Sequence, residues 1–110
     1  MQMSWITSLQ EWLLDNQNRL KQEEIRADVV GITSYTPSSI HVDFYAARFQ
    51  GTVELWEDGQ SEFYFLDWAA ADRDPEAGVE VTHHDFVRTN ELYAALETLV
   101  SRMSPALATR

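Results

Sequence analysis

The sequence predicts an α+β fold with an N-terminal helix, a four- to five-stranded antiparallel sheet in meander order and a C-terminal helix. Apolar residues recur every three or four positions near both ends of the chain, which is typical of amphipathic helices. Between residues 25 and 83 the period shortens to two, and Asp58-Gly59 is a strong hairpin turn. The 110 residues are the length of one domain, so we expect a single α+β domain over residues 1–110.

The first helix is expected from Ser4 to about Glu24. Ser4 is a good N-cap residue, because its hydroxyl can accept a hydrogen bond from a free N–H of the first turn. Six apolar residues form one stripe along this segment and predict the side that faces the core. These residues are Trp5, Ile6, Leu9, Trp12, Leu13 and Leu20.

The middle of the chain predicts four strands and a short fifth. β-branched and aromatic residues are frequent in it, and polar or glycine-containing turns separate its segments. Residues 69–78 are expected to form a loop before the last strand. The expected strands are 25–32, 40–49, 52–57, 61–68 and 79–83.

The closing helix is expected from Thr89, a plausible N-cap, to a point before Pro105. Its apolar stripe would cover the sheet. The stripe consists of Leu92, Ala95, Leu96, Leu99 and Met103.

Two-residue turns at Gln50-Gly51 and Asp58-Gly59 define a trial register, in which Tyr45 and Phe63 share a face with Trp56 and Glu54. One face is then apolar enough to be the core. It collects Ile40, Val42, Phe44, Ala46, Val53, Leu55, Tyr64, Leu66 and Trp68. The opposite face collects His41, Asp43, Tyr45, Ala47, Phe49, Thr52, Glu54, Trp56, Phe63, Phe65 and Asp67.

This second face combines five aromatic residues with three carboxylates and no base, a composition typical of a protein-binding surface. The alternative is that the closing helix or a second subunit covers it, which leaves a homodimer open. With neighbouring acidic residues added, the expected partner-binding residues are Tyr45, Phe49, Glu54, Trp56, Glu57, Asp58, Glu62, Phe63, Phe65 and Asp67.

Charge is concentrated in one part of the chain. The net charge is −10, and residues 54–85 hold ten acidic residues with Arg73 as their one basic residue. Such a field disfavours nucleic acid and would steer a protein partner with a basic surface. The alternative is an acidic surface that only keeps the protein in solution.

Several chemistries are excluded or disfavoured. Without cysteine there is no disulfide, zinc–thiolate site or cysteine nucleophile, and no phosphate-binding glycine motif occurs. His83 and His84 are adjacent on an expected strand and would point to opposite faces. The acidic stretch 72–78 departs from the calcium-loop pattern in the position of its glycine. We therefore expect no enzyme, no catalytic residue, no metal and no cofactor.

No run of about 20 apolar residues is present, so no membrane span is expected. The first residues lack the basic and apolar regions of a secretory signal, so we expect a cytoplasmic protein.

The tryptophan-bearing first helix, the hairpin Val53–Gly59 and the strand Phe63–Trp68 together resemble the TriTu family of bacterial immunity proteins. The resemblance spans roughly residues 5–103. It implies a small, non-enzymatic cytoplasmic protein, encoded beside a polymorphic toxin, that neutralises this cognate toxin by binding it. An alternative is a type III secretion chaperone, because those proteins are also small, acidic and α+β, and dimerise to hold an extended segment of a secreted effector.

Overall fold

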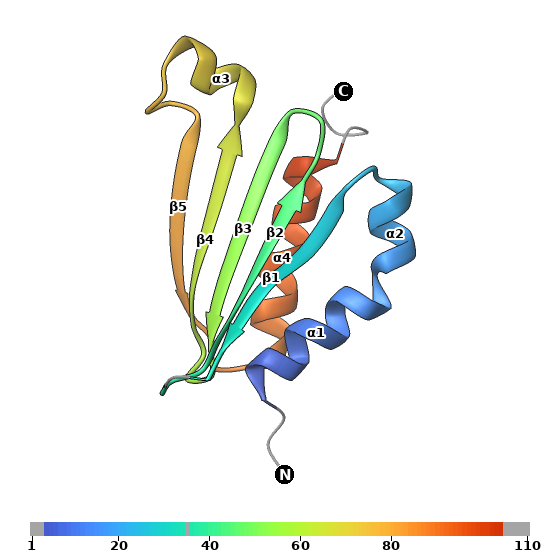
Figure 1. The fold of residues 1–110 in the computed structure, drawn as a ribbon, viewed down its shortest axis with the longest axis vertical. Coiled ribbons are helices and arrows are strands. Elements are labelled where there is room, and N and C mark those ends of the chain that lie inside the picture. Colours follow the sequence, from blue (N-terminus) through green and yellow to red (C-terminus); the bar gives the residue numbers. More distant parts are fainter. Residues whose placement is uncertain (1–3, 35, 105–110) are drawn as a thin grey trace.

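The computed structural model describes residues 4–34 and 36–104, and its architecture confirms the predicted α+β class (Figure 1). Five antiparallel strands follow one another in the order β1-β2-β3-β4-β5, which is the expected meander. The elements are α1 (Trp5–Asp15), α2 (Gln17–Gln22), β1 (Arg26–Thr33), β2 (Ser39–Tyr45), β3 (Phe49–Trp56), β4 (Gln60–Asp67), α3 (Trp68–Arg73), β5 (Val79–Asp85) and α4 (Thr89–Met103).

The expected first helix is divided at Asn16 into α1 and α2. The Asn16 side chain donates a 2.8 Å hydrogen bond to the carbonyl of Trp12, and Asn16 leaves helical geometry at φ −107°. Asparagine favours helix ends because its amide competes with the backbone for hydrogen bonds. The predicted cap at the other end is confirmed, because the Ser4 hydroxyl accepts a 3.2 Å bond from Thr7 N.

The C-terminal helix occupies the predicted residues but begins differently. Arg88, not Thr89, is at the N-cap position. One carboxylate oxygen of Glu91 accepts hydrogen bonds from Arg88 N (2.7 Å) and Val87 N (3.0 Å). This carboxylate in the first turn satisfies backbone donors that precede the helix, as the glutamate of a capping box does.

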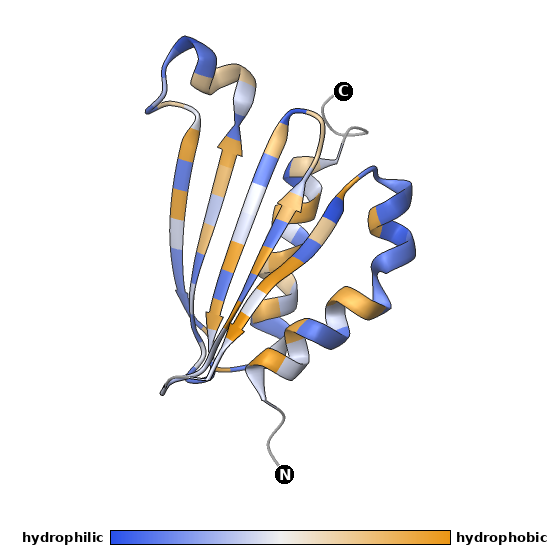
Figure 2. Cartoon of the chain, viewed as in Figure 1, coloured by the Kyte–Doolittle hydropathy of each residue, from blue (hydrophilic) through white to orange (hydrophobic). Residues whose placement is uncertain are grey.

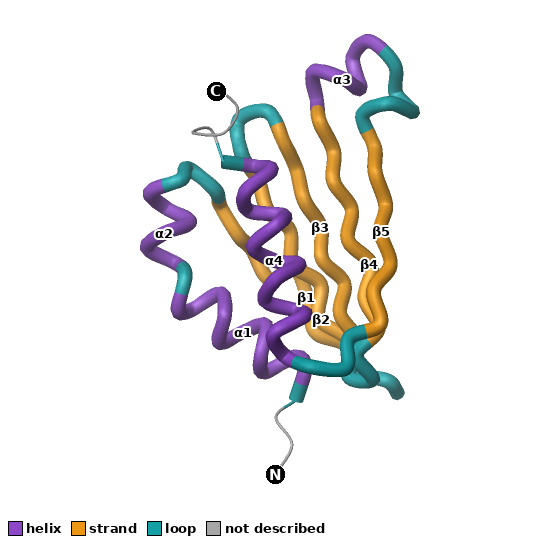
Figure 3. The backbone as a smooth tube through the Cα atoms, turned by 180° about the vertical axis from the view of Figure 1, so that it is seen from behind, coloured by secondary structure: helices purple, strands orange, loops and turns teal. Residues whose placement is uncertain are grey.

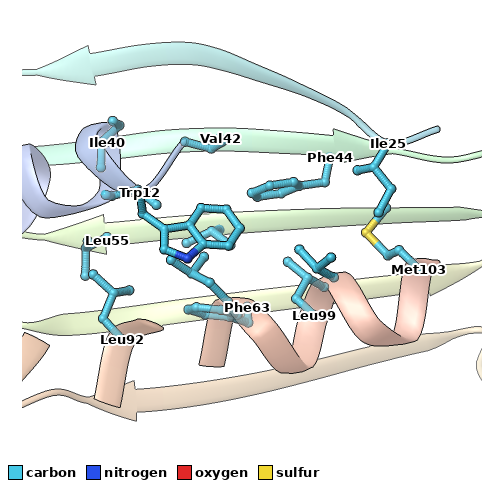
Figure 4. Close-up of a cluster of buried hydrophobic side chains, with 14 of the residues drawn as sticks. Trp12, Ile25, Ile40, Val42, Phe44, Leu55, Phe63, Leu92, Leu99 and Met103 are labelled. Atoms are coloured by element: carbon cyan, nitrogen blue, oxygen red, sulfur yellow. The ribbon is translucent and has the colours of Figure 1, made fainter. Parts of the chain in front are cut away.

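Both long helices pack on the same face of the sheet, as the front and back views show (Figures 1 and 3). Apolar and polar positions alternate along β2 and β3 (Figure 2), so these central strands present one apolar side to α1 and α4. Their stripes interlock with the sheet in one core (Figure 4). Side chains with no exposed surface are Leu9, Ile40, Val42, Phe44, Val53, Leu55, Leu92, Leu96 and Met103.

The predicted register between β3 and β4 is wrong by one residue. The loop has three residues, Glu57 to Gly59, and Val53 lies opposite Phe63. Gly59 has φ +90° and donates a 3.0 Å bond to the Trp56 carbonyl, as in hairpin loops that end on a left-handed residue. A one-residue slip exchanges the two faces of a strand, so the expected core residues Tyr64 and Leu66 lie on the opposite side.

The second predicted turn is also displaced. β2 ends at Tyr45, and β3 begins at Phe49, with Ala46 N bonded to Phe49 O across the connection at 2.9 Å. Phe49 therefore takes its direction from β3 and points into the core. The alternation along β2 is as expected, with Ile40, Val42 and Phe44 buried.

Trp68 was expected in the core and instead begins α3, where 48% of it is exposed. The expected loop 69–78 thus contains a short helix. Among the helices formed by residues 4–34 and 36–104, none has the length and apolar character needed to cross a membrane.

Candidate protein-binding face

The sheet has one face that α1 and α4 leave uncovered, which we call the open face. Within the described ranges, 4–34 and 36–104, no helix lies over it (Figures 1 and 3). Apart from Ser39, which is buried at the start of β2, its side chains are half-buried or exposed, whereas those of the opposite face of β2 and β3 are buried. From β2 to β5 the other members of the open face are His41, Asp43, Tyr45, Gln50, Thr52, Glu54, Trp56, Gln60, Glu62, Tyr64, Leu66, Val79, Val81, His83 and Asp85.

Asp43 is the centre of a hydrogen-bond network on this face. Its Oδ1 accepts from Thr52 Oγ1 at 2.8 Å and lies 3.0 Å from His41 Nε2, and its Oδ2 accepts from the Tyr45 hydroxyl at 3.2 Å. Burial, followed by the bond to Asp43, raises the pKa of Tyr45. His41 Nδ1 is also 3.5 Å from a Glu54 oxygen. The network fixes polar side chains of two strands in one arrangement and so gives the open face a defined surface.

A second group of polar side chains joins β4 to β5. The Tyr64 hydroxyl donates a 2.8 Å bond to one oxygen of Glu62, and the other oxygen lies 3.5 Å from His83 Nδ1. This bond to Glu62 is the main reason that the pKa of Tyr64 is raised. Glu62 is therefore held in position while remaining partly exposed.

Next to this group, and sharing Glu62 and His83 with it, the surface forms a hollow of about 650 Å³, which we call the acidic hollow. Three carboxylates line it, from Asp58, Glu62 and Asp85, together with Trp56 and His83. An indole beside carboxylates offers a cation both a ring face and charged hydrogen-bond acceptors. An arginine or lysine side chain of a partner has the chemistry that fits this hollow.

The structure supports the surface position of half of the predicted binding residues. Tyr45, Glu54, Trp56 and Glu62 lie on the open face, and Asp58 lies at its edge in the β3–β4 loop. The placement of the three phenylalanines is wrong, because both turns shift their strands. Phe49, Phe63 and Phe65 point into the core and are only 9%, 6% and 8% exposed.

The other two predicted binding residues are engaged within the protein. Glu57 accepts hydrogen bonds from the Ser4 hydroxyl and from Trp5 N, so it closes the start of α1. Asp67 receives two 2.9 Å bonds from Arg48 and caps α3, which lowers the pKa of its carboxyl, mainly through Arg48. Both carboxylates hold elements of the fold together.

The comparison with known proteins places the chain in a family. The family model described as "Immunity protein TriTu" matches residues 7–102, most of the chain. The chain belongs to the TriTu immunity protein family. No curated protein and no solved structure matches it.

Membership of the TriTu family confirms the predicted resemblance and indicates an immunity-type role. Proteins with that role act on a protein partner, the toxin, and their family is in general non-enzymatic. The candidate site in this TriTu protein is therefore a surface for protein binding.

Sequence reasoning missed several members of the open face, among them Tyr64, His83 and Asp85. In β4 both alternating sets carry aromatic residues, so composition does not distinguish its two faces. Only the length of the loop at Gly59 decides between them. A preference for the three-residue loop would have placed Tyr64 on the open face, whereas His83 and Asp85 are placed by the pairing of β5 with β4.

The histidine pair is arranged as predicted, on opposite faces of β5. His83 lies on the open face, while the His84 ring stacks on Phe86 with centroids 5.1 Å apart. Burial is the main cause that lowers the pKa of His84. Within the part of the chain that the structure describes, no three histidine, aspartate or glutamate side chains form a metal-binding group.

Proposed function

We propose that this chain neutralises a cognate bacterial toxin in the cytoplasm by binding the toxin through the open face. The observation that carries the proposal is a complete sheet face with no covering helix among the described residues, bearing aromatic and acidic side chains already fixed in place. Fixed side chains lose little conformational entropy on binding, which favours tight association. Membership of the TriTu family supports the immunity role.

The partner is a protein with a basic surface. Each of the five strands places a carboxylate on the open face, from Asp28, Asp43, Glu54, Glu62 and Asp85. Its basic residue in β1, Arg26, is paired with Asp28 at 3.0 Å and stacks on Tyr45. Complementary charge speeds the encounter and selects against partners of the same sign.

Trp56 is the proposed anchor of the interface. It is half-buried on the open face and borders the acidic hollow, so a partner can bury the rest of its ring. Tryptophan is enriched among residues that contribute most of the energy of an interface. We expect Trp56→Ala to weaken binding by about 2 kcal/mol or more, roughly 30-fold.

The test is co-expression with the toxin encoded in the neighbouring gene, scored by growth of the bacteria. Wild type should restore growth, whereas Trp56→Ala and the pair Glu62→Gln with Asp85→Asn should restore it poorly. Matched controls are Trp68→Ala, an exposed indole in α3, and the pair Glu11→Gln with Asp15→Asn on the exposed side of α1. These control variants should protect as wild type does.

Loss of protection in the controls, with the open-face variants still protective, would show that the toxin binds elsewhere. No growth difference in any variant, together with binding of an unfolded effector segment, would favour the secretion-chaperone alternative. Titration of each purified variant with an inactive toxin domain separates weak binding from poor folding.

A further inference from the structure

We propose that β5 accepts an extended basic segment of the protein partner as an additional strand of the sheet. The proposal rests on the proposed function and names how the partner continues beyond the open face. β5 is the last strand in the order and pairs only with β4. In the described ranges no element lies along its other side (Figure 1). Its backbone is therefore available for pairing.

Two hydrogen bonds identify which backbone groups of β5 face outward. Gly78 O accepts from Asp67 N, and Phe86 N donates to Gly59 O, both at 2.8 Å. These bonds lie at the two ends of the antiparallel β4–β5 ladder. In such a ladder the backbone N–H and C=O of every second residue bond to the paired strand, and those of the residues between them point away from it. The N–H and C=O groups directed away from β4 are those of Val79, Val81, His83 and Asp85.

The two edges of the sheet differ in how well they suit an added strand. The pairing of β1 with β2 shifts between Val29 and Gly31, and such a bulge interrupts an edge. β5 pairs with β4 without a shift from Val79 to Asp85 and contains no proline or lysine. β5 is thus the regular edge, without the bulge, proline or lysine that often block strand addition.

Apolar side chains run beside this edge on the open face. Val79 is 50% exposed, Val81 43% and Tyr64 39%. Apolar and polar positions alternate along the first half of β5 (Figure 2), where Glu80 separates Val79 from Val81. An added strand with apolar residues on the same face would cover these side chains and remove their apolar surface from water, which favours its binding.

Charge decides which occupant fits. Glu80 and Asp85 belong to β5, Glu62 lies beside it in β4, and Asp72, Asp74 and Glu76 precede it in the chain. The nearby cation of α4, Arg102, is already paired with Glu80 at 2.7 Å. A second copy of this chain would bring the same negative charges to the edge, whereas a segment that alternates apolar and basic residues complements it.

Amide hydrogen exchange followed by NMR tests the proposal with a synthetic peptide of alternating lysine and valine. In the free protein the amides of Val79, Val81 and His83 should exchange fast, and those of Glu80 and Thr82 slowly. The peptide should slow the first set about tenfold, the factor that about 1.4 kcal/mol of added protection gives. A matched peptide of alternating glutamate and valine should have no such effect.

Val81→Pro removes one outward N–H and leaves the ladder to β4 intact, so it should abolish the effect of the peptide. Val81→Ala keeps the N–H and should retain most of it. A lysine–valine peptide in which every second backbone amide is N-methylated cannot donate hydrogen bonds along one side. It tests the same bonds with the unaltered protein. The proposal would be overturned if the lysine–valine peptide did not slow exchange of the outward amides of β5. It would also be overturned if the glutamate–valine peptide slowed them equally, or if N-methylation of the lysine–valine peptide made no difference.

The growth assay separates this proposal from the proposed function. If Val81→Pro still protects cells while Trp56→Ala does not, the partner binds the open face without adding a strand. If Val81→Pro folds normally and fails to protect cells, strand addition is supported.

Discussion

Gly59 has a role that no other residue type can take without strain. Its φ is +90°, and a Cβ at this position would lie 2.4 Å from the Phe86 carbonyl oxygen and within 3.3 Å of the Trp5 ring. The same glycine ends the loop that determines the register of β4. One residue thus decides which aromatic residues of β4 enter the core.

We expect Gly59→Ala to lower the free energy of unfolding by about 2 kcal/mol or more, because it combines a left-handed backbone with a backbone clash. Gly31→Ala is the matched control, since a Cβ there meets no atom within 4 Å. That change should shift stability by less than about 1 kcal/mol. Urea denaturation measures both, and equal effects would contradict the assigned loop geometry.

The aromatic residues of β4 and α3 give a second test at this scale. Phe63 is buried, with its ring 4.9 Å from His84 and 6.2 Å from Phe86. Phe63→Ala should cost about 3–5 kcal/mol through the cavity that it leaves. Trp68→Ala should cost less than about 1 kcal/mol, because Trp68 lies half-exposed outside the sheet. Thermal melts of both variants check the result, and the reverse order would restore the trial register.

The face of a strand is predictable from sequence only where its two alternating sets differ in polarity. In β2 the set Ile40, Val42 and Phe44 is apolar and its alternates are polar, so the core side was predicted correctly. In β4 both sets hold aromatic residues, and loop length decides instead. The hydrophobic pattern of β4 does not indicate the loop length. The turn residues do not indicate it either, because Asp58-Gly59 suits a two-residue or a three-residue loop.

Among the elements, α3 shows how a short helix is attached to the end of a strand. Asp67 is the last residue of β4, and its Oδ1 accepts from Ala69 N at 3.1 Å and from Ala70 N at 3.3 Å. Arg48, from the β2–β3 connection, binds both oxygens of the same carboxylate. Three alanines that follow an aspartate cap indicate a helix here. The prediction of a loop over residues 69–78 did not take them into account.

The carboxyl group of Asp67 makes the free energy of unfolding depend on pH. Arg48 and the backbone donors lower its pKa in the folded protein below the ordinary value of 3.8, which the unfolded chain retains. Its contribution is therefore complete above that unfolded value and is lost as the pH falls through the lower folded value. Asp67→Asn should reduce stability at pH 7 and flatten its decline below about pH 4, as measured by denaturation at each pH. A decline as steep as in wild type would exclude this role.

Over the whole molecule, the folding core and the charged surface lie on opposite sides of one sheet. The helices close the apolar face, and carboxylates populate the other. The element order and the helix faces were predictable because their periodic patterns are long. The acidic hollow was not, since it joins residues of β3, β4 and β5 whose alignment depends on the loop at Gly59 and on the pairing of β5 with β4.

The charge distribution predicts that association with the partner slows as salt is added. Exposed charges are screened beyond about 8 Å at physiological ionic strength. We expect the association rate constant to fall at least severalfold between low and high salt, and Glu62→Gln with Asp85→Asn to reduce this dependence. Stopped-flow mixing with the inactive toxin domain measures the rate. An association rate that is the same at both salt concentrations would remove electrostatic steering from the explanation.

The meander order has a consequence for synthesis on the ribosome. Each strand pairs with its neighbour in the chain, so strand pairs can form in the order in which they emerge. The apolar side of the sheet, however, is completed only by Leu92, Leu96 and Met103 of the last helix. At about 5–20 residues per second, translation from Asp85 to Met103 takes about one to four seconds, and that surface stays half-covered at least until then. A nascent chain paused in this interval exposes the apolar side of its sheet to chaperones. Pausing of translation within α4 should therefore lower the yield of folded protein more than pausing after α4.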